Sequence, residues 1–234
     1  MDEAEVWAAV DRRREALVLM LSGLDRSDWQ RRSLCDGWTI HDVAAHLTMP
    51  LIGIRRLLPL GLRHPGGTNT FIREVSKELA RRHDPDQVIA NLRSMIGFHR
   101  HFPTLTCREA LIDVLGHSLD IAIPLGRAGS AAAEALATSL PPVEVAEAAD
   151  RVTSYAGRGR NRVFRDVGQT GPRLVASDHS WTFGDGPEIR GTMTDLFLLL
   201  IGRTVHLDRL TGEGVVAIRQ GGERQQGRFS TGSP

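Results

Sequence analysis

Apolar residues recur at helical spacing through the first 156 residues of the chain. The spacing and its start signals predict helices over 3–23, from Thr39 to the middle fifties, over 70–82, from Asp84 to about Phe102, from Thr106 to Ile123 and over 142–156. Pro50 marks a kink or break in the second of these helices, and Pro124 with Gly126 ends the one that begins at Thr106. The small residues from Gly126 to Leu140 indicate a linker. We therefore expect a helical domain over residues 1–156.

The pattern changes to short strand-like runs in the last third of the chain. Strands are predicted over 173–177 and 180–184, with a further strand beginning over 188–191 and a last one over 215–218, and helical stretches are predicted over 194–202 and 204–210. These elements predict a small mixed α/β domain over residues 157–220. Residues 221–234 have too little apolar content to pack, so they are expected to be a disordered tail. The fold class expected for the whole chain is α+β.

A polar stripe runs along the helix predicted for residues 106–123. At about 100° per residue, Glu109, Asp113, His117 and Asp120 fall within roughly 80° of one another, and the rest of the helix is apolar. A helix that is apolar almost all round is typical of a buried position, so its stripe is expected to face the protein interior. Asp113 and His117, four residues apart, lie side by side and can present an oxygen and a nitrogen to one cation.

A simpler interpretation of Asp113 and His117 is an ordinary hydrogen-bonded pair within one helix. Such a pair stabilises a helix by about 0.2–0.5 kcal/mol and needs no metal. A buried carboxylate is nevertheless costly without a cation or donors beside it, which favours the metal site.

His46 is the best candidate for a third ligand from another helix. On the helix that begins at Thr39, its neighbours are apolar or small, whereas His41 lies on the opposite side. His99 is the rival, because it continues an inward-facing apolar row. The alternative for His46 is a hydrogen-bonded histidine of the core.

Composition and charge narrow the classes of partner. A net charge of +1 over 234 residues gives no electrostatic reason to expect nucleic acid or an anionic membrane as a partner. Apolar runs such as Leu196 to Ile201 fall far short of the ~20 residues that span a bilayer. The acidic start of the chain is unlike a signal peptide, and Cys35 and Cys107 form no metal-type or redox-type spacing. A cytoplasmic protein is expected.

Three segments together resemble the mycothiol-dependent maleylpyruvate isomerase family: CDGWTIHDVAAHL (35–47), IDVLGHSLDIAIPLGR (112–127) and DHSWTFGDGPEIRGTMTDLFLLLIGR (178–203). The resemblance implies a DinB-like N-terminal four-helix bundle followed by a small sterol-carrier-like C-terminal domain. It also implies a divalent metal, commonly zinc, held by His46, Asp113 and His117, and mycothiol as the low-molecular-weight thiol. The family has a glutamate where this chain has Asp113, a departure that bears on metal identity, geometry or affinity.

The function implied is that of a metal- and mycothiol-dependent isomerase or S-transferase acting on a small electrophilic substrate. The resemblance also draws attention to Arg203 as a contact for a substrate carboxylate; its alternative is an arginine that satisfies carbonyls at a helix C-terminus. The competing hypothesis for the chain is a non-catalytic binding protein for small molecules, with the polar stripe as a structural feature. The oligomeric state is not readable from the sequence.

Overall fold

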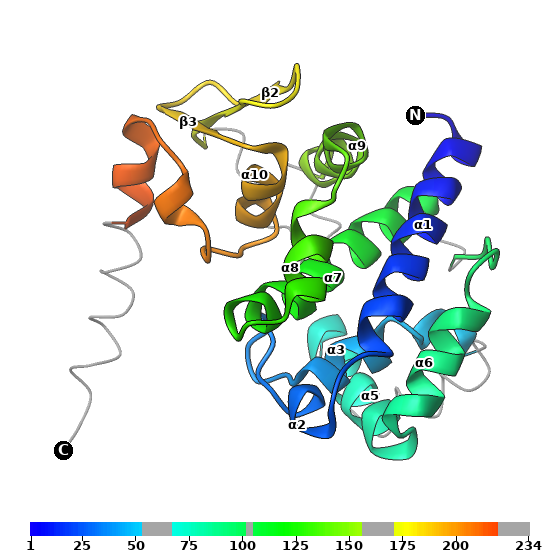
Figure 1. The fold of residues 1–234 in the computed structure, drawn as a ribbon. Helices are drawn as coiled ribbons and strands as arrows, with labels where there is room; N and C mark the ends of the chain where they lie inside the picture. Colours follow the sequence, from blue (N-terminus) through cyan, green and yellow to red (C-terminus); the bar gives the residue numbers. More distant parts are fainter. Residues whose placement is uncertain (53–66, 102–104, 156–170, 220–234) are drawn as a thin grey trace. The chain divides into compact units, whose positions relative to one another are not determined.

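The chain divides into two compact units, Met1–Leu140 and Pro141–Pro234. The computed structural model describes residues 1–52, 67–101, 105–155 and 171–219 (Figure 1). The sequence prediction placed the domain boundary after residue 156, one helix later than this division. Helix α9 (Pro142–Thr153) belongs to the second unit, where it packs against α10 (Met193–Leu200).

The described part of the first unit is helical. Its helices are α1 (Glu3–Leu21), α2 (Arg26–Trp29), α3 (Ile40–His46), the short 3₁₀ helix η1 (Met49–Leu51), α5 (Thr68–Arg82), α6 (Pro85–Ser94), α7 (Cys107–Arg127) and α8 (Ala131–Thr138). Helix α7 packs against α1, α3 and α8, and α3 packs against α5. The shared core contains side chains that are at most 1% exposed, among them Leu17, Leu21, Ile40, Val43 and Ile121.

Side-chain caps start the helices that matter for the site. The Thr39 side chain accepts from the backbone N–H of Asp42, and the Asp42 side chain accepts from the N–H of Thr39. Thr106 and Glu109 make the corresponding reciprocal cap for α7. Each cap satisfies N–H groups that have no partner inside the helix, so α3 and α7 begin where the sequence predicted.

Several predicted boundaries were wrong. The linker predicted over residues 126–140 contains α8, because its alanines favour a helix and the Ser130 side chain caps it. Helix α6 ends at Ser94 rather than near Phe102, which lies outside the described residues. Helix α3 ends at His46, and the proline at position 50 falls in η1.

Pro124 lies inside α7 instead of ending it. A proline has no N–H to donate to the carbonyl four residues earlier, which here belongs to Asp120. The backbone N–H of Leu34 donates to that carbonyl at 3.1 Å. The proline therefore leaves an acceptor on α7 that the loop before α3 uses.

The second unit contains a small mixed sheet. Strands β1 (Arg173–Ala176), β2 (Thr182–Phe183) and β3 (Glu188–Gly191) have the order β2-β1-β3, with β1 antiparallel to β2 and parallel to β3. Helix α10 packs on β1 and β3, and the short helix η3 (Leu207–Arg209) follows it. The strand predicted over 215–218 is wrong, because residues 213–219 are helical. The predicted tail lies outside the described residues.

The predicted α+β class is confirmed: a helical unit precedes a small unit of mixed strands and helices (Figure 1). Among the described residues, no helix combines the length and the apolar character that crossing a membrane requires.

Candidate metal centre

His46, Asp113 and His117 converge on one point in the first unit. The Nε2 atom of His46 lies 3.3 Å from Oδ1 of Asp113, and the Nε2 atom of His117 lies 3.5 Å from the same oxygen. The three side chains each offer one ligand atom within 4.8 Å of the others. The structure thus brings together the trio predicted from the sequence.

The distances suit a small divalent cation. Zinc bonds of about 2.0–2.1 Å to nitrogen and oxygen give a tetrahedral ligand-to-ligand separation of about 3.3 Å. The two separations measured from Asp113 Oδ1 are 3.3 and 3.5 Å. Two imidazoles and a carboxylate are also a donor set that zinc accepts, and three protein ligands leave a position open. The residues present therefore fit a divalent metal.

Two helices supply these side chains. His46 is the last residue of α3, and Asp113 and His117 lie one turn apart on α7, against which α3 packs. The Ser76 hydroxyl on α5 donates to the carbonyl of Ile72 at 2.7 Å and lies 3.1 Å from Nδ1 of His46. Because its one proton is used, this hydroxyl accepts from Nδ1–H of His46 and leaves Nε2 of that ring with a free lone pair.

Exposure differs within the trio. The side chain of Asp113 is 38% exposed, that of His117 is 20% exposed and that of His46 is 11% exposed. The indole of Trp38 covers the two imidazoles, with its ring centroid 5.4 Å from that of His46 and 6.4 Å from that of His117. The centre is therefore walled by an aromatic ring and reached from solvent at Asp113.

The electrostatics keep Asp113 ionised. Burial raises the pKa of this carboxyl group, but the interactions with His46, together with those with His117 and Arg14, outweigh burial and lower the pKa below its ordinary 3.8. An ionised carboxylate is the form that binds a metal.

His117 has the opposite tendency. Burial lowers the pKa of its ring, but the hydrogen bond to Asp120, the contact with Cys35 and the charge of Asp113 raise it well above the ordinary 6.5. Metal binding requires the neutral ring, so a cation at this centre displaces a proton from His117.

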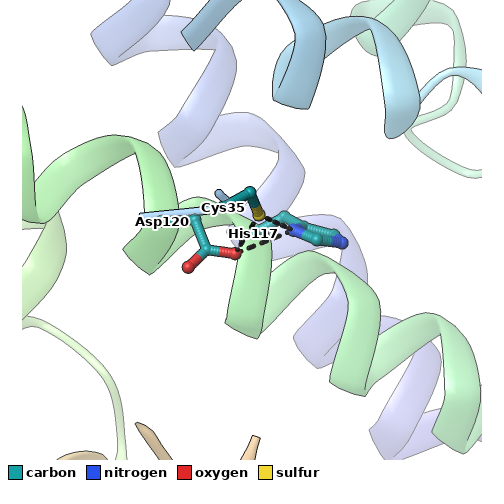
Figure 2. Close-up of side chains that lie close together, drawn as sticks. All are labelled: Cys35, His117 and Asp120. Carbon is teal, nitrogen blue, oxygen red and sulfur yellow. Dashed lines mark hydrogen bonds and ion pairs between the residues drawn. The ribbon is translucent and has the colours of Figure 1, made fainter. Parts of the chain in front are cut away.

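A second cluster lies behind His117, and it was not predicted from the sequence. Figure 2 shows Cys35, His117 and Asp120 side by side, with Oδ2 of Asp120 2.9 Å from Nδ1 of His117 and 3.0 Å from Sγ of Cys35. The sequence placed Asp120 in the polar stripe, but Cys35 was noted only as a cysteine without metal-type or redox-type spacing to Cys107. The spacing of residues along the chain does not show which helix a loop residue contacts.

The remaining polar candidates lie elsewhere. His99, the rival third ligand, has its Nε2 atom 2.8 Å from Oδ2 of Asp11, and its ring stacks on Trp7 at 4.9 Å between centroids. His41 bonds the carbonyl of His83 through Nε2. Neither belongs to the two clusters of potential metal ligands found among the described residues.

Arg203 follows α10 in the second unit. Its Nη1 atom donates to the carbonyl of Ile201, the C-cap residue of α10, at 3.2 Å. This contact is of the kind expected for an arginine that satisfies helix-terminal carbonyls. A role of Arg203 in binding a substrate carboxylate stays a prediction.

Comparison with known proteins agrees with the resemblance noted in the sequence. Residues 10–97 match the family model for the mycothiol maleylpyruvate isomerase N-terminal domain. This segment contains His46 but ends before Asp113 and His117. A search of curated proteins found no match.

Solved structures extend the likeness over most of the chain. The crystal structure of the mycothiol-dependent maleylpyruvate isomerase is similar to this chain with a TM-score of 0.59 at 14% sequence identity, covering 91% of this chain and 93% of that one. A histidine-to-alanine mutant of a mycothiol-dependent maleylpyruvate isomerase gives a TM-score of 0.57 at 15% identity, with the same coverage. Residues 10–97 thus match the mycothiol maleylpyruvate isomerase N-terminal domain, and the fold of the chain is similar to that of the mycothiol-dependent maleylpyruvate isomerase, as the sequence resemblance predicted.

Proposed function

We propose that this chain is a mycothiol-dependent enzyme of the maleylpyruvate isomerase type that uses a divalent metal, most simply zinc. The convergence of His46, Asp113 and His117 carries the proposal, because each residue offers a ligand atom within 4.8 Å of those of the other two. The N-terminal domain match and the shared fold support the choice of mycothiol as the thiol.

The three side chains would hold the metal from two helices and leave an open position. The bound metal would supply a Lewis acid at which a coenzyme thiol loses its proton. Ser76 keeps Nε2 of His46 directed at Asp113, and Trp38 limits the water that reaches the two rings. The partly exposed Asp113 marks the side from which thiol and substrate approach.

The reaction proposed is nucleophilic addition of the thiol sulfur to an electrophilic carbon of a small unsaturated substrate. Addition converts the substrate double bond to a single bond, about which the molecule can rotate. Departure of the same thiol then restores the double bond in the other configuration, which is cis–trans isomerisation. An S-transferase would stop at the adduct. Arg203 is proposed, secondarily, as a contact for a substrate carboxylate.

Metal content and thiol-dependent turnover test the proposal together. The purified protein should contain close to one zinc per chain and convert maleylpyruvate only when mycothiol is present. Asp113→Ala and His117→Ala should lose both metal and turnover. His41→Ala is the matched control, because His41 shares α3 with His46 and bonds a backbone carbonyl instead.

A non-catalytic small-molecule binding protein remains the second candidate. In its favour, His46 and His117 can supply the hydrogen bonds that the Asp113 carboxylate needs, without any metal. A protein that holds no zinc after purification without chelator, and takes up none on addition, would support this candidate over the enzyme.

A further inference from the structure

Asp120 is the most buried charged group near the centre. Its side chain is 0% exposed, and it lies three residues after His117 on α7. Leaving a carboxylate in such a position is costly unless donors surround it. The carboxylate oxygen Oδ2 receives two of them, Nδ1–H of His117 at 2.9 Å and S–H of Cys35 at 3.0 Å (Figure 2).

The backbone brings Cys35 to this oxygen. The carbonyl of Asp120 that Pro124 cannot engage accepts from the N–H of Leu34 at 3.1 Å, which fastens the loop against α7 one residue before the cysteine. A turn then follows, closed by the N–H of Trp38 donating to the carbonyl of Cys35 at 3.1 Å, with Gly37 at φ 70°. A positive φ at the third position of a turn favours glycine. The loop thus holds the thiol in a defined place.

We infer that Asp120 is a positioning residue for the metal centre, which fixes His117 with its proton on Nδ1 and its Nε2 lone pair directed at Asp113. The inference rests on the proposed function, since it assigns a role toward the metal. His46 obtains the same orientation from a neutral hydroxyl, whereas His117 obtains it from a buried carboxylate that a loop thiol steadies. A carboxylate behind a ligating imidazole also raises the basicity of the ligand.

The same three groups suggest a competing interpretation, in which they hold a metal of their own. Cys35 Sγ lies 3.7 Å from Nδ1 of His117, and all three ligand atoms lie within 4.8 Å. Such a site would need the proton that Nδ1 of His117 donates to Asp120 to be removed while Nε2 serves the first centre. The full burial of Asp120 and its two hydrogen bonds favour the positioning role.

Zinc affinity, measured by competition with a chromophoric chelator on the full chain, tests the inference. Asp120→Ala should weaken zinc binding by about 10- to 100-fold, the usual effect of removing such a carboxylate. Asp120→Asn should recover part of that loss, because its amide oxygen still accepts from Nδ1–H. Cys35→Ala should show a smaller loss than Asp120→Ala, because His117 keeps its partner.

Ser118→Ala is the matched control for a purely structural effect. Ser118 is also 0% exposed on α7, and it accepts from Nε of Arg13 at 2.6 Å. Its loss should lower the unfolding temperature and leave zinc affinity unchanged. If Asp120→Ala bound zinc as tightly as the wild type, or if Ser118→Ala lost as much affinity, the positioning role would be wrong while the proposed metal centre stood.

Cobalt substitution separates the positioning role from a second metal site. In protein without added mycothiol, one Co²⁺ per chain and no thiolate-to-cobalt absorption band would support the positioning role. Two metals per chain, with one lost together with that band in Cys35→Ala, would overturn it in favour of a second site. A wild-type protein that binds neither zinc nor cobalt would overturn the proposed function and this inference together.

Discussion

Each unit of this protein contains an aspartate–histidine constellation, and the two differ in what surrounds them. In the first unit, Asp113 meets the Nε2 atoms of two histidines, and its side chain is 38% exposed. In the second unit, Asp195 meets Nδ1 of His206 at 2.7 Å, and each side chain is 8% exposed. The same residue types therefore form an open set of ligand atoms in one place and a closed pair in the other.

Local roles explain the difference. Asp195 is the third residue of α10, where its backbone N–H and side chain pair with Thr192. Its other carboxylate oxygen receives His206, so the pair joins the start of α10 to the segment after it. Asp113 caps no helix, and its shared oxygen faces two rings from two helices. A buried pair that completes a helix cap stabilises the fold. A partly exposed carboxylate beside the lone pairs of two imidazoles is suited to binding a metal ion.

The largest effect should come from removing the metal. Dialysis of the full chain against a strong chelator should abolish mycothiol-dependent turnover, and added zinc should restore it. Circular dichroism should change little, because the core helices pack through apolar side chains. Turnover that survives with no detectable metal would end the distinction drawn between the two constellations.

Breaking the closed pair should affect stability and leave metal binding alone. Asp195→Ala leaves a buried His206 without its partner and should cost about 3 kcal/mol of unfolding free energy. Hydrogen exchange of the α10 backbone reports this loss within the second unit, and zinc content should remain that of the wild type. Asp208→Ala, an exposed position close by, is the control and should change neither. A loss of zinc in Asp195→Ala would contradict the separation of roles.

Acid should weaken the closed pair at a predictable pH. Burial raises the pKa of Asp195, but hydrogen bonds from His206 and Thr192 and the charges of His206 and Arg209 outweigh burial and lower the pKa below the ordinary 3.8. A depressed carboxyl pKa contributes stability that is present above the unfolded-state value and is lost as the pH falls through the folded-state value. Exchange protection of α10 should therefore fall below about pH 4.

Asp195→Asn supplies the comparison for that titration. Its amide cannot ionise, so the decline in protection over this pH interval should flatten. An identical acid profile in the two proteins would show that another group governs the loss.

The smallest expected effect comes from lengthening the side chain of Asp113, the partly exposed carboxylate. Asp113→Glu adds one methylene and keeps a ligand that zinc accepts, so metal affinity should change by about tenfold or less. The chelator competition proposed for Asp120 measures it directly. Complete loss of metal would mean that the reach of the side chain, more than its chemistry, defines the centre.

The convergence of the three candidate ligands could be predicted from the sequence because each of these residues obeys a local rule. Asp113 and His117 share a face of α7 through helical spacing, and His46 faces inward on a helix whose start the Thr39 cap marks. Helix α8 was missed because small residues were interpreted as a linker, although alanine is the strongest helix former. The strand predicted over 215–218 followed β-branched residues that a helix accommodated instead.

The sequence pattern could not predict the contacts that support His46 and His117. Cys35 lies in a loop, and its meeting with Asp120 depends on where that loop crosses α7. Ser76 lies on a helix predicted correctly, but its bond to His46 depends on how α3 and α5 pack. Spacing along one helix is a local property, whereas contacts between segments require the assembled fold.

Pro124 carries a consequence for engineering this protein. A propensity scale scores a proline in mid-helix as a defect of about 3 kcal/mol, and a stabilising redesign would replace it first. The replacement would give the carbonyl of Asp120 a partner inside its own helix and compete with Leu34 for it. A gain in helix stability would thus loosen the loop that carries the Cys35 thiol, through a carbonyl four residues before the replaced proline and without changing His46, Asp113 or His117.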